Sequence, residues 1–304
     1  MLCFGTGPER TLRSQSGGFF DNGASARHLV RVKDDQKSVR REKRVGGHVP
    51  GLSTSPAFTV LQSRPTPIPI VIGAPHGGRA YPPALLEEMR DPAFSTIRLE
   101  DRYVDKLAIK VGEQTGATVV VAHAPRAMID LNRALEETDW TMLDRASAGP
   151  EWAGRKIGRR ARGGLGLVPR RLPGLGDIWK RPLAREELDR RIEGVHRPYH
   201  QALGAQLETI RERWGAALLI DLHSMPPLTS TSGPAAQFVV GDRFGASCDS
   251  GLIAPALGYF AETGRLAVHN RPYAGGFILD SHGQPRRNIH AMQVEVCRQA
   301  YLDD

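Results

Sequence analysis

Short apolar runs, separated by stretches with helical periodicity, constrain the fold of this chain more than any other sequence feature. The run IPIVIGA at 68–74 is rich in β-branched residues, and similar runs follow at 117–124, 216–223, 236–242, 264–270 and 290–296. Strands that are apolar without alternation are typical of a sheet covered on both faces. The sequence therefore predicts an α/β fold of three layers, with a mixed, mostly parallel central sheet and helices on both faces.

Helical patterns lie between several of these runs. Apolar residues recur at steps of three and four from Leu188 to Trp214, which predicts an amphipathic helix that Pro198 kinks or divides. Two further helices are predicted over residues 100–115 and 250–263. This alternation of strands and helices favours an α/β domain over an all-β one.

The positive charge is concentrated in two segments. The net charge is +8, of which residues 1–50 carry +5 and residues 153–182 carry +8, so the remainder carries −5. We expect residues 1–55 to be a disordered basic extension and residues 56–304 to form a single domain. We expect the Gly- and Arg-rich stretch at about 153–182 to be a long loop, either a lid over an anionic substrate or simply solvated. Charge confined to a tail and a loop argues against nucleic-acid binding.

The sequence gives no sign of a membrane or disulfide-bonded protein. It has no run of about 18 apolar residues and no apolar segment typical of a secretory signal. Its three cysteines, Cys3, Cys248 and Cys297, do not have the spacing of a metal site or a disulfide framework. We therefore expect a cytoplasmic protein without a membrane partner; its oligomeric state is not indicated.

Two predicted central strands end in histidine. VIGAPH ends at His76 and LLIDLH ends at His223. Ligands of open α/β sheets collect beyond the carboxyl ends of the strands, and a catalytic zinc site commonly has two histidines and one carboxylate. The segment LEDRYVD offers Glu100, Asp101 and Asp105 as carboxylates. The alternative is that each histidine is an ordinary turn residue, and the pattern alone leaves both interpretations open.

Further polar residues suit hydrolysis of an acidic substrate. Glu295 lies within an apolar strand, where it either faces the crevice as a general base or faces solvent on an edge strand. Arg126, Asn132 and Arg133 follow another strand, and an arginine fork suits a carboxylate. The alternative for Arg126 is a surface ion pair with Asp130 or Glu136. His200 is expected to be a packed helix residue.

The ordered motifs of the chain resemble those of the N-formylglutamate amidohydrolase family, which is related to zinc carboxypeptidases and aspartoacylases. The motifs are APHGGRAYP, EDRYVDKL, APRAMIDLNRA, RPYHQAL, LLIDLHSMP, RPYAGGFI and HAMQVEVCRQAYLDD. The resemblance runs from about Pro67 to the end of the chain and leaves residues 1–55 outside it. It implies a phosphorylase/hydrolase-like α/β fold.

The resemblance also implies roles for individual residues. His76 and His223 match metal ligands, Glu295 matches the catalytic carboxylate, Asn132 and Arg133 match a pair that holds a substrate carboxylate, and Arg126 would assist catalysis. Carboxypeptidase-like enzymes have an acidic ligand three residues after the first histidine, but this chain has Arg79 there. We therefore expect Asp101 to be the third ligand of one Zn²⁺ per chain, with Glu100 as the alternative.

The resemblance implies a zinc-dependent hydrolase that cleaves N-formyl-L-glutamate, or a close N-acyl amino acid, to formate and glutamate in histidine degradation. One alternative is a carboxypeptidase-like hydrolase of another small acidic amide or peptide. Another is a non-enzymatic module that binds anions or nucleic acid through the basic segments. The strand positions of His76, His223 and Glu295 favour the enzyme over the binding module, and we expect its substrate to be a small anion.

Overall fold

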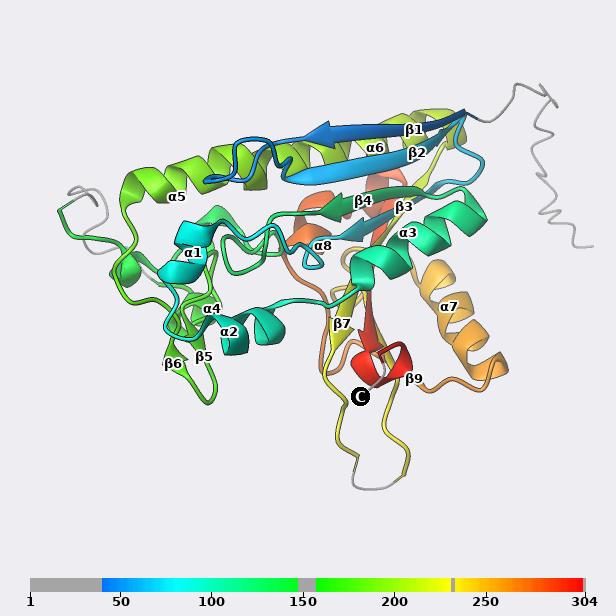
Figure 1. Cartoon of the computed structure of the whole chain (residues 1–304). Coiled ribbons are helices and arrows are strands. Elements are labelled where there is room, and N and C mark those ends of the chain that lie inside the picture. Colours follow the sequence, from blue (N-terminus) through cyan, green and yellow to red (C-terminus); the bar gives the residue numbers. More distant parts are fainter. Residues whose placement is uncertain (1–39, 147–156, 231–232, 303–304) are drawn as a thin grey trace, which may run out of the picture. The chain divides into compact units, whose positions relative to one another are not determined.

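The computed structural model describes residues 40–146, 157–230 and 233–302, which form one mixed α/β domain (Figure 1). An eight-stranded sheet has the order β1-β2-β4-β3-β7-β10-β8-β9. Its strands are β1 (Arg40–Gly46), β2 (Phe58–Arg64), β3 (Ile70–Ala74), β4 (Thr118–Ala122), β7 (Ala217–Met225), β8 (Phe238–Gly241), β9 (Ala267–His269) and β10 (Ile289–Cys297). The neighbours β4, β3, β7 and β10 are mutually parallel, whereas β1, β2 and β8 join through antiparallel pairs.

Helices cover both faces of the sheet. The helical elements are α1 (Pro83–Glu87), α2 (Pro92–Leu99), α3 (Val104–Thr115), α4 (Arg159–Arg162), α5 (Arg185–Arg191), α6 (Arg197–Trp214), α7 (Ser250–Glu262) and α8 (Phe277–His282), with short turns η1 (Leu135–Glu137), η2 (Trp140–Met142), η4 (Ile192–His196), η5 (Pro285–Arg287) and η6 (Arg298–Ala300). Leu203 of α6 belongs to the same buried apolar cluster as Val71 and Leu219. Val104 of α3 belongs to a second cluster with Ile72, which points to the opposite face of β3 from Val71. The predicted three-layer architecture is confirmed.

The long apolar stripe forms a helix that contains a π-helical turn before Pro198. Helix α5 continues through the π-helical turn η4 into α6, and Pro198 lies in the first turn of α6. Proline has no backbone N–H to donate, so it is tolerated in a first turn. The sequence predicted that Pro198 kinks or divides this helix; the helical run is not divided, and its one irregularity is the π-helical turn just before Pro198.

The helix predicted from residue 100 begins later, at Val104. The backbone N–H of Asp101 donates to the carbonyl of His76, and Tyr103 has a positive φ of 61°. These two features hold residues 100–103 in a turn. The prediction was therefore wrong for the four residues 100–103, which include Glu100 and Asp101.

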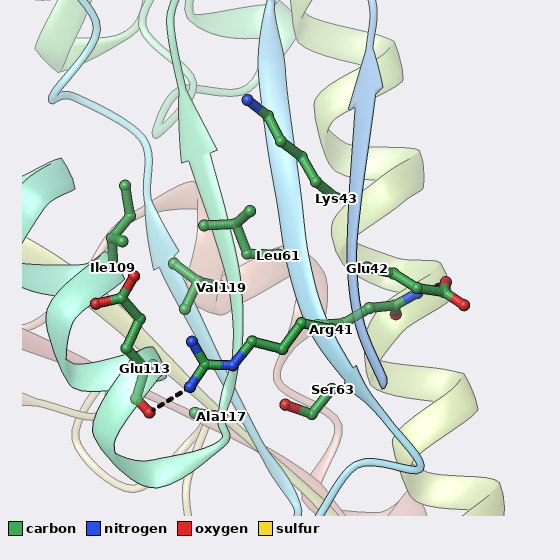
Figure 2. Close-up of a pocket in the computed structure, with 11 residues that line it drawn as sticks. Arg41, Glu42, Lys43, Leu61, Ser63, Ile109, Glu113, Ala117 and Val119 are labelled. Atoms are coloured by element: carbon green, nitrogen blue, oxygen red, sulfur yellow. Dashed lines mark hydrogen bonds between the residues drawn. The ribbon is translucent and has the colours of Figure 1, made fainter. Parts of the chain in front are cut away.

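The expectation that residues 1–55 are disordered is wrong for residues 40–55. β1 pairs antiparallel with β2 along seven residue pairs from Arg40–Arg64 to Gly46–Phe58. Figure 2 shows the Arg41 side chain reaching across to α3, where its Nη2 donates to the carbonyl of Glu113 at 3.0 Å. A small pocket lies between β1, β2 and α3, and none of the predicted site residues lines it. Residues 1–39 lie outside the described part of the chain.

The described part of the basic stretch at 153–182 is packed against the domain. It contains α4 and the two-stranded ladder of β5 (Arg171–Leu172) and β6 (Gly176–Asp177). Leu167 and Ile178 are fully buried in the largest apolar cluster. Residues 157–182 are therefore not a simple solvated loop, and residues 153–156 lie outside the description.

No helix among the described residues is both long enough and apolar enough to cross a membrane.

Candidate active site

Side-chain alternation on two adjacent parallel strands brings polar groups to one face of the sheet. On β7, Asp221 and His223 alternate with Leu222, and on β10, Gln293 and Glu295 point to the same side as each other. The register pairs Glu295 with His223. Glu295 is 7% exposed. The alternative of a solvent-facing Glu295 is therefore excluded.

His76 reaches the same place from the loop after β3. The rings of His76 and His223 lie 4.8 Å apart between centroids. The backbone at Gly78 approaches the carbonyl of Ala124 so closely that a Cβ there would collide with it. Glycine at this position allows the chain to turn tightly after the strand and leaves His76 over the edge of the sheet.

Asp101 completes a buried three-residue cluster. Its Oδ2 lies 3.6 Å from Nδ1 of His76 and 3.1 Å from Nδ1 of His223. All three side chains are at least 95% buried. Ligand atoms about 2.1 Å from a tetrahedral zinc ion are separated by about 3.4 Å. The cluster thus has the ligand types and the spacing of a metal site.

The far nitrogen of each histidine is held by a carboxylate. Nε2 of His76 lies 2.7 Å from Asp130 Oδ1, and Nε2 of His223 lies 2.9 Å from Asp221 Oδ2. This leaves Nδ1 of His76 buried without a hydrogen-bond partner. Metal-ligating histidines usually have their second nitrogen bound in this way. The orphaned nitrogen and the carboxylate supports both fit a metal ion.

The electrostatics of the cluster also favour a cation. Burial opposes the charge of Asp101, but the hydrogen bond from His223 and the proximity of His76 lower its pKa far below the usual range. Burial opposes a proton on His223 as well, yet Asp221 and Asp101 raise its pKa well above the usual value. Four buried carboxylates, Asp101, Asp130, Asp221 and Glu295, surround the two histidines. A divalent cation would neutralise part of this negative charge.

Glu295 is in position to exchange a proton beside the cluster. Gln293 Nε2 donates to Glu295 Oε1 at 2.9 Å. Burial, together with the charge of nearby Asp101 and against the opposite effect of His223, raises the pKa of Glu295 to about 7. A carboxylate with such a pKa can both accept and release a proton near neutral pH.

Arg126 is connected to the cluster through Asp130. Its Nε donates to Asp130 Oδ2 at 2.9 Å, while Oδ1 of the same carboxylate contacts His76. Burial disfavours the charge of Arg126, but Asp130 and Asp101 raise its pKa. The ion pair that the sequence offered as an ordinary surface alternative does form, but its carboxylate is buried and shared with a predicted metal ligand.

Asn132 and Arg133 follow in a buried loop. The backbone N–H of Ile278, in α8, donates to Asn132 Oδ1 at 2.9 Å, which leaves the Nδ2 amide as a donor. Nδ2 lies 3.5 Å from Gln293 Oε1. Arg133 donates through Nε to the carbonyl of Leu165 and through Nη1 to that of Asn132. The loop is therefore linked to Glu295 through Gln293.

Other acidic candidates do not join the cluster. Glu100 Oε2 lies 3.2 Å from Arg102 Nε, and Asp105 pairs with Arg79 at 2.8 Å. Of the two expected third ligands, Asp101 is the one that lies beside the histidines. Asp130, Asp221 and Gln293 were not given site roles from the sequence. Their spacing of two residues from Asn132, His223 and Glu295 was the available signal.

Several known proteins are similar to this chain in sequence and fold. Residues 68–302 match the family described as N-formylglutamate amidohydrolase. The chain belongs to the N-formylglutamate amidohydrolase family. It is 32% identical to the N-formylglutamate deformylase of Pseudomonas putida over 244 aligned residues. The aligned region covers 78% of this chain and 83% of the relative. It is 30% identical over 261 residues to the Pseudomonas aeruginosa protein of the same name, covering 81% and 86%.

A solved relative has the same architecture. The crystal structure of N-formylglutamate amidohydrolase from Ralstonia eutropha JMP134 superposes with a TM-score of 0.72 at 32% identity, covering 81% of this chain and 88% of that one. Family membership thus agrees with the resemblance of the sequence motifs, and the activity of the family is amide hydrolysis.

Proposed function

We propose that this chain hydrolyses N-formyl-L-glutamate to formate and glutamate, with one zinc ion held by His76, Asp101 and His223. The buried three-ligand cluster beside Glu295 is the observation that carries the proposal. The names of the Pseudomonas relatives support the substrate. Two histidines and one carboxylate are a known catalytic zinc set that leaves a coordination position free. Release of glutamate would suit a step in histidine degradation.

The zinc ion, when bound, would supply Lewis-acid chemistry, lowering the pKa of water to about 7 and polarising a carbonyl. Glu295 would take the proton of the attacking water and deliver it to the nitrogen of the leaving amine. Its pKa of about 7 suits both transfers. The Nε of Arg126 donates to Asp130, which holds the guanidinium in place. Its Nη groups would stabilise the negative charge that develops on the formyl oxygen.

Asn132 and Arg133 would bind the carboxylates of the substrate. The Nδ2 amide of Asn132 has a second hydrogen beside the one that lies towards Gln293, and the Nη2 group of Arg133 is not used by the two backbone contacts of that side chain. Holding the glutamate moiety would orient the formyl group towards Glu295 and Arg126. A small anionic substrate is therefore expected.

The test measures bound metal and formate release on the same preparation. We expect about one zinc per chain and release of formate from N-formyl-L-glutamate. His76→Ala should lose both, because it removes a ligand. His290→Ala is the matched control, since His290 lies at the opposite end of β10, where its Nδ1 accepts from the N–H of Asp249. It should keep both.

Wild-type protein that binds zinc without releasing formate would refute the proposed substrate. Wild-type protein that releases formate equally well after complete metal removal would refute the metal dependence. Assays with N-acetyl- and N-succinyl-L-glutamate test whether the enzyme prefers another acyl group to formyl. Faster hydrolysis of either would make the chain a hydrolase of another small acidic amide.

A further inference from the structure

Three histidines outside the proposed metal site form a stacked group against the loop that carries Asn132. The rings of His196 and His200 lie 4.5 Å apart, and those of His200 and His282 lie 5.3 Å apart and nearly parallel at 11°. Phe277, at the start of α8, contacts both His196 and His200. The mechanism above uses none of these histidines.

Two of these histidines bind the backbone on either side of Asn132. Nε2 of His200 lies 2.9 Å from the carbonyl oxygen of Leu131, and Nε2 of His196 lies 2.9 Å from that of Arg133. A carbonyl oxygen only accepts hydrogen bonds, so both Nε2 atoms must carry hydrogen. The sequence-based expectation that His200 only packs is thus incomplete.

The third histidine determines which tautomer His200 can adopt. Nδ1 of His200 lies 3.0 Å from Nε2 of His282. A neutral His200 with hydrogen on Nε2 has a lone pair on Nδ1, which therefore accepts from Nε2–H of His282. The two rings form a directed chain that ends on the carbonyl of Leu131.

The surroundings keep this group neutral. Burial, with the neighbouring His196 and His282, lowers the pKa of His200 well below its usual value. Burial lowers the pKa of His196 too, although Asp130 and Glu136 act in the opposite direction and Arg197 reinforces it. Burial lowers the pKa of His282 to about 4, against the effect of Asp221.

The Asn132 loop is therefore fixed from several directions. The backbone N–H of Asn132 donates to Asp130 Oδ1 at 2.8 Å, and the side-chain Oδ1 of Asn132 accepts from the N–H of Ile278 in α8. We infer that His196 and His200 are positioning residues that hold Asn132 and Arg133 in place to bind the substrate carboxylates, and that His282 fixes the tautomer of His200. This inference rests on the proposed function.

Loss of one support should weaken substrate binding more than chemistry. In His200→Leu the carbonyl of Leu131 loses its donor, and we expect KM for N-formyl-L-glutamate to rise about tenfold while kcat falls less than about threefold. The inhibition constant of glutamate, which binds without reacting, should rise by a similar factor. Zinc content should not change, because neither the metal ligands nor Asp130 and Asp221 contact His200.

Conservative variants distinguish positioning from packing. The side-chain amide of glutamine can donate from about the position of Nε2, so His200→Gln should restore KM to within about threefold of wild type. His282→Leu leaves His200 in place but removes its donor, and should raise KM by about threefold. It also provides a test if His200→Leu does not fold.

Leu207→Ala is the matched control on α6. Leu207 is buried two turns beyond His200, so the variant should lower thermal stability substantially yet leave KM unchanged. Unchanged KM and glutamate inhibition in both His200→Leu and His282→Leu would overturn the inference, as would equal effects of His200→Gln and His200→Leu. Failure of the proposed function looks different, because the wild-type protein itself would then release no formate.

Discussion

The two halves of the candidate site are built in different ways. His223 and Glu295 lie on adjacent parallel strands in the middle of the sheet, where the ladder between β7 and β10 sets their separation. Asn132 and Arg133 lie in a loop whose backbone carbonyls accept from His196 in η4 and His200 in α6, while the Arg133 side chain donates to the carbonyl of Leu165. One half is fixed by regular structure and the other by individual hydrogen bonds.

This difference predicts how substitutions in each half should affect the site. Strand-borne groups have few ways to move, so a substitution among them should remove a chemical function without disturbing its neighbours. A loop held by single hydrogen bonds should shift when a distant support is lost. Asp130 joins the halves, because its Oδ1 accepts from the N–H of Asn132 and also contacts His76, whose ring lies beside that of His223.

The largest expected effect is on the strand-borne half. Glu295→Gln keeps the shape of the side chain but cannot take a proton, so kcat should fall by about a thousandfold. Zinc content and KM should stay close to wild type, since Glu295 is not among the predicted ligands. Steady-state kinetics with metal analysis checks this. Loss of zinc from Glu295→Gln would show that Glu295 is a ligand and that the assignment of Asp101 needs revision.

A smaller effect should separate the two carboxylates that support the histidines. Asp221→Asn weakens the support of His223 alone, and we expect zinc affinity to fall by about 10- to 100-fold with normal kcat at saturating zinc. Asp130→Asn should lower zinc affinity similarly and also reduce kcat, because Arg126 loses its ion partner. Zinc titration of the metal-free protein, followed by kinetics, measures both. If both variants recover full kcat at saturating zinc, Asp130 does not link the halves.

The sequence predicted the strands of the strand-borne half because they depend on local pattern. The apolar runs before His76 and His223 predicted these strands, but the period of two left open whether Glu295 faces the crevice or solvent. The roles of Asp221 and Gln293 required knowing that β10 lies beside β7, although β8 and β9 come between them along the chain. Such pairings of distant segments are not encoded in local periodicity.

The remaining errors have similar causes. β1 has the sequence RREKRVG, and its pattern of exposure leaves no apolar period to recognise. Charged residues are usual on an edge strand, where they discourage pairing with another chain. The late start of α3 follows from the contact between Asp101 and the backbone of His76, which lies 25 positions earlier. The packing histidine expected at position 200 binds a backbone carbonyl in another segment.

The loop-borne half should also respond to acid through His282. Its pKa of about 4 in the folded protein lies below the value of about 6.5 expected when unfolded. As pH falls, the unfolded chain therefore takes up the proton first, so the stability that neutral His282 contributes is complete above about pH 6.5 and is lost as pH falls towards 4. Because His282 is partly exposed, we expect about 1 to 2 kcal/mol of lost stability between pH 7 and pH 5.

Denaturant unfolding at several pH values measures this loss. His282→Gln does not titrate in this range and should show a shallower decline in the free energy of unfolding than wild type. Parallel declines in the two proteins would mean that His282 is not held neutral.

The smallest expected effect is far from both halves of the site. Arg41→Ala removes the hydrogen bond from β1 to the carbonyl of Glu113, which Figure 2 shows. The side chain is exposed, so the free energy of unfolding should fall by no more than about 0.5 kcal/mol. KM and kcat should not change, because the site halves are held by β7, β10, α6 and α8 rather than by β1. A rise in KM in Arg41→Ala would mean that the Asn132 loop responds to general loosening of the domain, and that its histidine supports are not specific.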